Sequence, residues 1–261
     1  MGRRTTELVA LGSAVMVALV VLATASAATR SAGMVRVEDL GSGAGEVWVM
    51  LPETPPKCMI VFLHAGGDLS PSRYTSWLGH LSLGDKCAVL FPRYELRASD
   101  SPASDQAALR RAIRSGLGYY LGTTYGLAKN PATPNPRWYA IGVGQGATLA
   151  LAYAARAESW GLQTPRAIDA VFPVVPSSAE LPAAPLPASV HVFVQTGDRP
   201  VTATGGAAVW KYLTLSHDAR RSRAVVHSSK ALPATLSAPL LTTAAAETAF
   251  WVPADEMIER R

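Results

Sequence analysis

The chain has few charged residues, few cysteines and few histidines. Charged residues make up only 16% of its 261 residues and hydrophobic residues 49%, a balance that excludes a disordered or fibrous protein. Two cysteines are too few for a structural zinc site of their own, and none of the five histidines has a partner at metal-ligand spacing. The sequence therefore predicts no metal ion and no cofactor.

A concentrated basic surface is also missing. The formal net charge is +5, and its densest cluster contains only Arg220, Arg221 and Arg223. Proteins that bind nucleic acids gather lysine and arginine on one face, and many add aromatic residues that stack on the bases. Nucleic acid is therefore not an expected partner.

The N-terminal segment has the features of an export signal. Two arginines precede an uncharged stretch from Leu8 to Ala28, in which Ala25-Ser26-Ala27 provides the small residues of a signal-peptidase site. The stretch contains 21 residues, enough to span a bilayer, so an uncleaved membrane anchor is the alternative. Residues 1–28 are predicted to be a signal peptide or an anchor, and residues 29–261 a domain that is secreted or tethered outside the cytoplasm.

The rest of the sequence alternates between strand and helix patterns. Residues 34–40 and 46–51 alternate like half-buried strands of a hairpin, whereas residues 59–63 and 88–91 are continuous apolar runs, as in parallel strands buried on both faces. Further strands are predicted at 138–141, 168–175, 190–195 and 223–226, and helices at 71–83, 104–121, 147–158, 206–215 and 239–250. This order predicts one α/β domain with a doubly wound, mostly parallel sheet and an N-terminal antiparallel hairpin.

Four short motifs follow predicted strands. Residues 63–67, Leu-His-Ala-Gly-Gly, resemble an HGG-type oxyanion loop, and residues 141–147 resemble a G-x-S-x-G nucleophile elbow. Asp198 resembles a catalytic acid at a strand end, and residues 234–239 resemble an A-D-H-x-A-P loop that carries a histidine. Together these motifs resemble those of the α/β-hydrolase superfamily, in particular its bacterial esterase- and lipase-like branch, and the resemblance implies an α/β-hydrolase fold over most of the chain after the leader.

Two of the three catalytic positions have lost their chemistry. The position that matches the nucleophile is Gly144, which has no side chain, and the position that matches the histidine is Leu236, which cannot accept a proton. Asp198 is retained, but an acid that orients a histidine has no catalytic task without one. The sequence therefore predicts a non-catalytic hydrolase-like protein. The alternative is an active esterase- or lipase-like hydrolase with an atypical nucleophile, such as Ser177 or Ser178, and His227 as a substitute base.

The resemblance also implies that backbone donors of an oxyanion hole survive. The N–H of Gln145 and that of Ala65 or Gly66 would converge above the sheet and hold a carbonyl or carboxylate without cleaving it. A small apolar or carboxylate ligand, or a protein partner, is the expected binding partner. A simpler alternative is that the glycines only turn the strand and pack the helix, with no ligand.

The two cysteines are candidates for a disulfide. Cys58 and Cys87 each precede a buried strand, and in the hydrolase-like sheet order these strands are parallel neighbours. Neighbouring strands lie ~4.8 Å apart, within the Cα distance that a disulfide tolerates. An exported protein meets an oxidising compartment. The alternative is a pair of free, buried thiols.

Overall fold

The computed structural model describes residues 36–97, 100–123, 136–175, 181–215 and 220–259. The leader at residues 1–28 lies outside these ranges, as do the candidate nucleophiles Ser177 and Ser178, so the structure does not test the predictions made for them. None of the described helices combines the length and the apolar character that crossing a bilayer requires.

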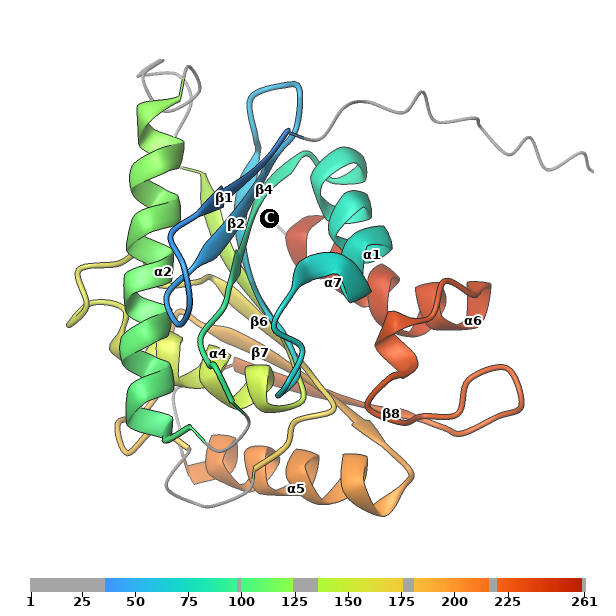
Figure 1. The fold of residues 1–261 in the computed structure, drawn as a ribbon. Coiled ribbons are helices and arrows are strands. Elements are labelled where there is room, and N and C mark those ends of the chain that lie inside the picture. Colours follow the sequence, from blue (N-terminus) through green and yellow to red (C-terminus); the bar gives the residue numbers. More distant parts are fainter. Residues whose placement is uncertain (1–35, 98–99, 124–135, 176–180, 216–219, 260–261) are drawn as a thin grey trace, which may run out of the picture. The chain divides into compact units, whose positions relative to one another are not determined.

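An eight-stranded sheet forms the centre of the domain, with the strand order β1-β2-β4-β3-β5-β6-β7-β8 (Figure 1). The first two strands form an antiparallel hairpin and β2 is antiparallel to β4, while every other neighbouring pair is parallel. The predicted fold is confirmed. The strands are β1 (Arg36–Leu40), β2 (Val47–Leu51), β3 (Cys58–Leu63), β4 (Cys87–Pro92), β5 (Arg137–Val143), β6 (Ala167–Val171), β7 (His191–Gly197) and β8 (Arg220–Val226).

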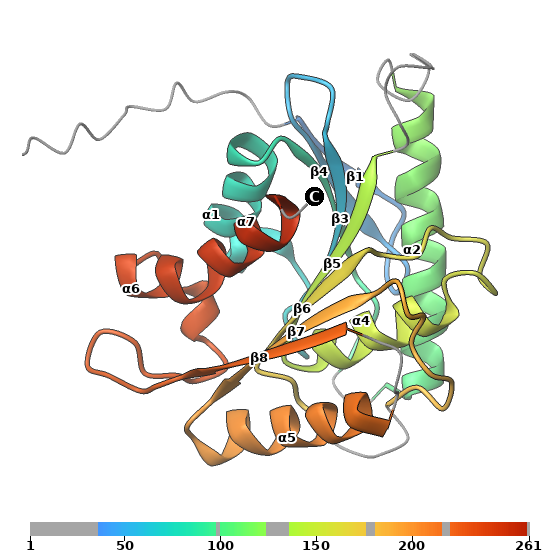
Figure 2. The same ribbon diagram turned by 180° about the vertical axis from the view of Figure 1, so that it is seen from behind.

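Helices cover both faces of the sheet. Figures 1 and 2 show α2, α4 and α5 on one face and α1, α6 and α7 on the other. The helices are η1 (Pro71–Tyr74), α1 (Thr75–Gly79), η2 (His80–Gly84), α2 (Pro102–Gly122), α4 (Gln145–Arg156), α5 (Pro200–Leu215), η4 (Ala238–Leu240), α6 (Ala244–Ala246), η5 (Glu247–Trp251) and α7 (Val252–Glu259).

The two helix layers explain why the central strands are apolar without alternation. In β3, Met59 and Val61 pack toward the α2 layer, while Ile60 and Phe62 pack toward the α1 layer. All of β3 is buried because successive side chains point to opposite faces and both faces are covered.

The structure corrects three of the predicted helices and one strand: the helix predicted over 206–215 begins at Pro200, and the strand predicted over 168–175 ends at Val171. The helix predicted from Ser104 begins one turn earlier, because the Ser101 side chain caps it and Pro102 occupies its first turn. The helix predicted over 239–250 is broken: Leu241 has extended backbone after η4, and Thr243 caps a new helix that starts at Ala244.

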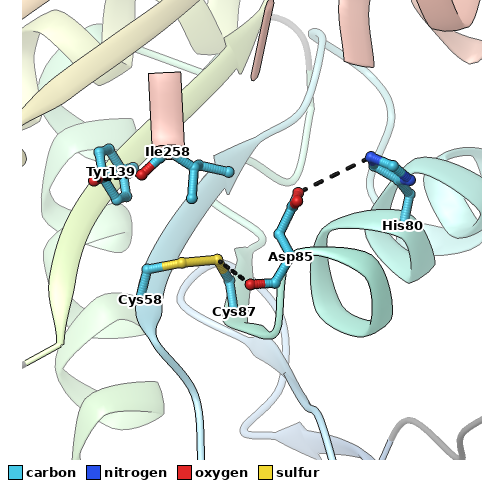
Figure 3. The surroundings of a disulfide bond; sticks show 6 residues. All are labelled: Cys58, His80, Asp85, Cys87, Tyr139 and Ile258. Atoms are coloured by element: carbon cyan, nitrogen blue, oxygen red, sulfur yellow. Dashed lines mark hydrogen bonds and ion pairs between the residues drawn. A yellow bond between two sulfur atoms is a disulfide. The ribbon is translucent and has the colours of Figure 1, made fainter. Parts of the chain in front are cut away.

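The predicted disulfide between Cys58 and Cys87 is confirmed (Figure 3). The two residues are direct partners in the register of β3 and β4, with Cα atoms 4.7 Å apart, and both are buried on the α1 face. Closing a loop of this length stabilises the fold by about 3–4 kcal/mol in the chain-entropy description. The alternative of two free thiols is therefore wrong.

Candidate functional site

A sharp strand-to-helix elbow lies between β5 and α4. Its apex is Gly144, with φ 60° and ψ −119°, a conformation that costs energy in a residue with a side chain. The Gly144 N–H donates to the Val171 carbonyl oxygen at 2.9 Å, and the Val174 N–H donates to the Gly144 carbonyl oxygen at 3.0 Å. The chain thus keeps the backbone geometry on which α/β-hydrolases carry their nucleophile.

The glycines on either side of the apex are fixed by packing. A Cβ on Gly142 would lie 2.6 Å from Ala147 Cα, and a Cβ on Gly146 would lie under 3.0 Å from the carbonyl oxygens of Leu63 and His64. These neighbours are backbone atoms, which cannot rotate away. Both positions therefore require glycine for the fold, whether or not the elbow carries out chemistry.

The apex itself has more room. A Cβ on Gly144 would lie 3.3 Å from Ala65 Cβ and 3.9 Å from Val174 Cγ2. A small side chain would therefore meet only mild crowding together with the strain of the positive φ. The apex provides space for a nucleophile, and the sequence provides none.

Most backbone N–H groups of the loop after β3 already donate hydrogen bonds to other groups of the protein. The Ala65 N–H donates to the Tyr74 hydroxyl at 2.9 Å, the Gly67 N–H donates to the Glu95 carboxylate, and the Asp68 N–H donates to the Ala65 carbonyl oxygen. Of the two predicted oxyanion donors in this loop, only Gly66 has no hydrogen bond from its N–H within the described part of the chain. Tyr74 lies on η1, nine residues after Ala65, so residue type and spacing alone do not reveal this contact.

Gln145 connects the elbow to its surroundings. Its Oε1 lies 2.7 Å from the position of a Cβ on Gly66, and its Nε2 donates to Asp105 Oδ2 at 3.4 Å. Asp105 is buried near the start of α2. The side chain of Gln145 therefore lies against the oxyanion loop, beside the two backbone amides assigned to that hole.

The side chain of His64 is buried beneath the loop after β3 and contacts it. It is fully buried, stacks on Tyr94 with ring centroids 4.1 Å apart, and donates from Nδ1 to the Ala65 carbonyl oxygen at 2.8 Å. The Tyr94 hydroxyl donates to the His64 carbonyl oxygen at 2.6 Å. Burial lowers the pKa of His64 to about 4, so the ring is neutral near pH 7. These contacts give His64 a structural role.

Asp198, directly after β7, has a partner other than histidine. Its Oδ2 accepts the Ser228 N–H at 2.7 Å and its Oδ1 accepts the Ser228 hydroxyl at 2.6 Å. These hydrogen bonds, first that of the hydroxyl and then that of the N–H, lower the pKa of Asp198. His227 Nδ1 lies 3.9 Å from Asp198 Oδ2, but its side chain is 80% exposed. The carboxylate thus holds the loop after β8.

Leu236 lies in that same loop region, half-buried against the hydrophobic cluster of the α1 face. An apolar side chain there can neither accept nor return a proton. Of the three positions that the motifs predict for a triad, the structure thus has no side chain at Gly144, an apolar one at Leu236 and a carboxylate at Asp198.

A second group of polar residues lies at the other end of the sheet, next to the disulfide (Figure 3). His80 Nε2 lies 2.9 Å from Asp255 Oδ1 and 4.0 Å from Asp85 Oδ2. Burial and then the charge of Asp255 raise the pKa of Asp85 to about 7. Such residues can ligate a cation, and sequence spacing could not reveal them because Asp255 is remote in the chain. The hydrogen bond between His80 Nε2 and the Asp255 carboxylate gives both side chains a partner within the protein.

Neither a protein-family model nor a curated protein matches this chain. Several solved structures are similar to it in fold. A carboxyl esterase from the fungus Tuber melanosporum shares 13% identity over 88% of this chain and 89% of its own, with a TM-score of 0.59. An esterase from Rhizomucor miehei shares 15% over 87% and 83%, with a TM-score of 0.61. An esterase of the bacterial hormone-sensitive lipase family shares 16% over 86% and 84%, with a TM-score of 0.59.

These similarities define the class of the fold. The chain has the α/β-hydrolase fold, as its motifs predict. At this level of identity the neighbours show a shared fold and leave the activity to be argued from the site.

Proposed function

We propose that this chain is a non-catalytic α/β-hydrolase-fold protein that binds a small ligand or a protein partner outside the cytoplasm. One observation carries the proposal: the elbow apex is Gly144, in the strained conformation of a nucleophile but without a side chain. Leu236 at the histidine position adds a second, independent loss. A triad that lacks both groups has no means of forming and resolving an acyl-enzyme.

The surroundings of the elbow favour one kind of ligand. The N–H groups of Gly66 and Gln145 are the donors that remain for an incoming oxygen atom. Glu95, just after β4, accepts the Gly67 N–H of the loop, and Asp68 of the loop is paired with Arg73, so a ligand with a negative charge would meet the carboxylate of Glu95. A small apolar ligand with a neutral carbonyl therefore fits the elbow better than a carboxylate does.

Export is supported by two features. The leader has the charge, length and small residues of a signal peptide or anchor, and the Cys58–Cys87 disulfide is typical of oxidising compartments. A reporter that is active only outside the cytoplasm, fused to residues 1–40, should be active. Mass spectrometry of the mature N-terminus then separates cleavage after Ala27 from an intact anchor.

A second candidate function is an active ester hydrolase with an atypical nucleophile. The observation that favours it is the approach of His227 to Asp198, an acid–histidine pair at the correct end of the sheet. A fluorogenic short-chain ester separates the two functions. The non-catalytic protein should show no turnover above buffer, whereas turnover that His227→Ala abolishes would support the hydrolase.

A further inference from the structure

A groove on the α2 layer is lined by four arginines. It has a volume of about 660 Å³ and extends along the first turns of α2 to the C-terminal end of α4. Arg110, Arg111 and Arg114 come from α2, and Arg156 comes from the last turn of α4, with Trp160 just beyond it. The groove does not include Gly144, Asp198 or Leu236, so it is separate from the elbow.

The charge of this groove is not balanced by its walls. None of its lining residues is acidic, and the ion pairs among the described residues include none of these four arginines. Arg114 donates to the Trp160 carbonyl oxygen at 2.6 Å and Arg111 to the Ala44 carbonyl oxygen at 3.3 Å. Both acceptors are neutral, so the positive charge stays in the groove.

The side chain of Arg110 has a buried donor. Its Nε is buried and has no hydrogen-bond partner within the described residues. A buried donor without an acceptor is costly, and arginine binds phosphate oxygens with two parallel hydrogen bonds. Arg110 and Arg114 are one helical turn apart on α2, a spacing that places both on the same face toward the groove.

We infer that this groove is a binding site for a phosphomonoester attached to a small apolar group. Guanidinium groups from two helices would neutralise the double negative charge of the phosphate. Pro102, Ala103 and Ala107 line the same groove and would contact an apolar substituent. Such a ligand is either a free organic phosphate or the headgroup of an anionic lipid, since both present the same chemistry.

Calorimetric titration of the full chain with phenyl phosphate tests this site. Binding is expected, with benzoate, which has one charge on the same ring, at least tenfold weaker. The double variant Arg110→Gln/Arg156→Gln should weaken phenyl phosphate binding at least tenfold. Arg220→Gln/Arg223→Gln on β8, which removes the same charge elsewhere, should leave it unchanged. Equal losses in the two double variants, or equal affinity for benzoate, would overturn the site and indicate a general effect of positive charge.

Vesicles separate the two sources of the phosphate. The full chain is added to phosphatidylcholine vesicles with and without phosphatidic acid, and only the difference between them is counted, because the leader can bind either. A difference that Arg110→Gln/Arg156→Gln removes, without binding of phenyl phosphate, assigns the site to a lipid headgroup. Binding to phenyl phosphate alone assigns it to a free ligand. Binding to neither overturns the inference.

Discussion

Under the proposed function, the elbow and the acid loop depart from a hydrolase site in opposite ways. At the elbow the backbone is intact and the reactive side chain is missing: Gly144 keeps φ 60° between two glycines that the packing requires. At the acid loop the side chain is intact and its partner has changed, because Asp198 accepts two hydrogen bonds from Ser228. Packing thus accounts for the flanking glycines of the elbow, and hydrogen bonds to the loop after β8 account for Asp198.

If the elbow is fixed by packing, its flanking glycine should matter more than its apex. Gly146→Ala places a methyl group against the carbonyl oxygens of Leu63 and His64, and we expect a loss of about 3 kcal/mol or more in the free energy of unfolding. Gly144→Ala adds mainly backbone strain and should cost roughly 1–2 kcal/mol. Urea unfolding measures both.

A matched control for these two variants is Gly79→Ala. Apart from its chain neighbours and the backbone of its own helix, no atom lies within 4 Å of a Cβ at that position, so alanine should be neutral or stabilising. A loss at Gly144 as large as that at Gly146 would show that the apex, too, is fixed by packing.

Strand β6 lies between β5, which leads to the elbow, and β7, which leads to Asp198. It contains a buried carboxyl group, which predicts that the stability of the fold depends on pH. Asp169 on β6 is fully buried and accepts Gln195 Nε2 at 3.0 Å on both oxygens, and burial raises its pKa to about 7. The folded state therefore holds this proton between about pH 4 and 7, where the unfolded state releases it. The contribution of this group to the free energy of unfolding is complete below about pH 4, falls as the pH rises, and is gone above the folded-state pKa of about 7.

Asp169→Asn should remove this contribution. The difference in unfolding free energy between variant and wild type should change by up to about 1.4 kcal/mol per pH unit between pH 4 and 7 and then level off. Taking the difference cancels His64, whose lowered pKa acts in the opposite direction. Unfolding curves that stay parallel across this range would contradict a raised pKa of Asp169.

A smaller effect should show that Asp198 now serves the loop. Asp198→Ala removes both hydrogen bonds to Ser228, while Ser228→Ala removes the one from the hydroxyl. Each variant should lower the melting temperature slightly, and the double variant should be no less stable than Asp198→Ala. Additive losses would mean that the two side chains stabilise the loop independently.

The smallest expected effect is a low rate of ester hydrolysis in a variant that carries both a serine and a histidine. Gly144→Ser alone should hydrolyse a fluorogenic ester no faster than the wild type, because Leu236 leaves it without a base. Gly144→Ser/Leu236→His should give measurable turnover. Equal rates in the two variants would identify another base, and Gly144→Ser/His227→Ala then tests whether it is His227.

The parts of the fold that follow local pattern could be predicted from the sequence. Continuous apolar runs predicted the parallel strands, and the equivalent positions of Cys58 and Cys87 before two of them predicted the disulfide. The glycines of residues 141–147 likewise predicted the sharp turn between β5 and α4. Each of these features follows from the order of residues along the chain once the order of strands in the sheet is known.

Contacts between distant loops could not be predicted in this way. Ser228 is a partner of Asp198 because the loop after β8 returns to the end of β7. Asp169 could have been noticed as a charged residue inside an apolar strand, but its partner Gln195 lies on another strand. In these cases the residue type shows that a partner is needed, and tertiary structure decides which residue it is.

The absence of a nucleophile is tested most directly by an active-site probe. The purified wild-type chain is incubated with a fluorophosphonate and its intact mass is measured, with Gly144→Ser/Leu236→His as the variant in which a reactive serine is restored. We expect the wild type to keep its unmodified mass and the double variant to gain one adduct. One adduct per molecule on the wild-type chain would show that it is a serine hydrolase with an unrecognised nucleophile.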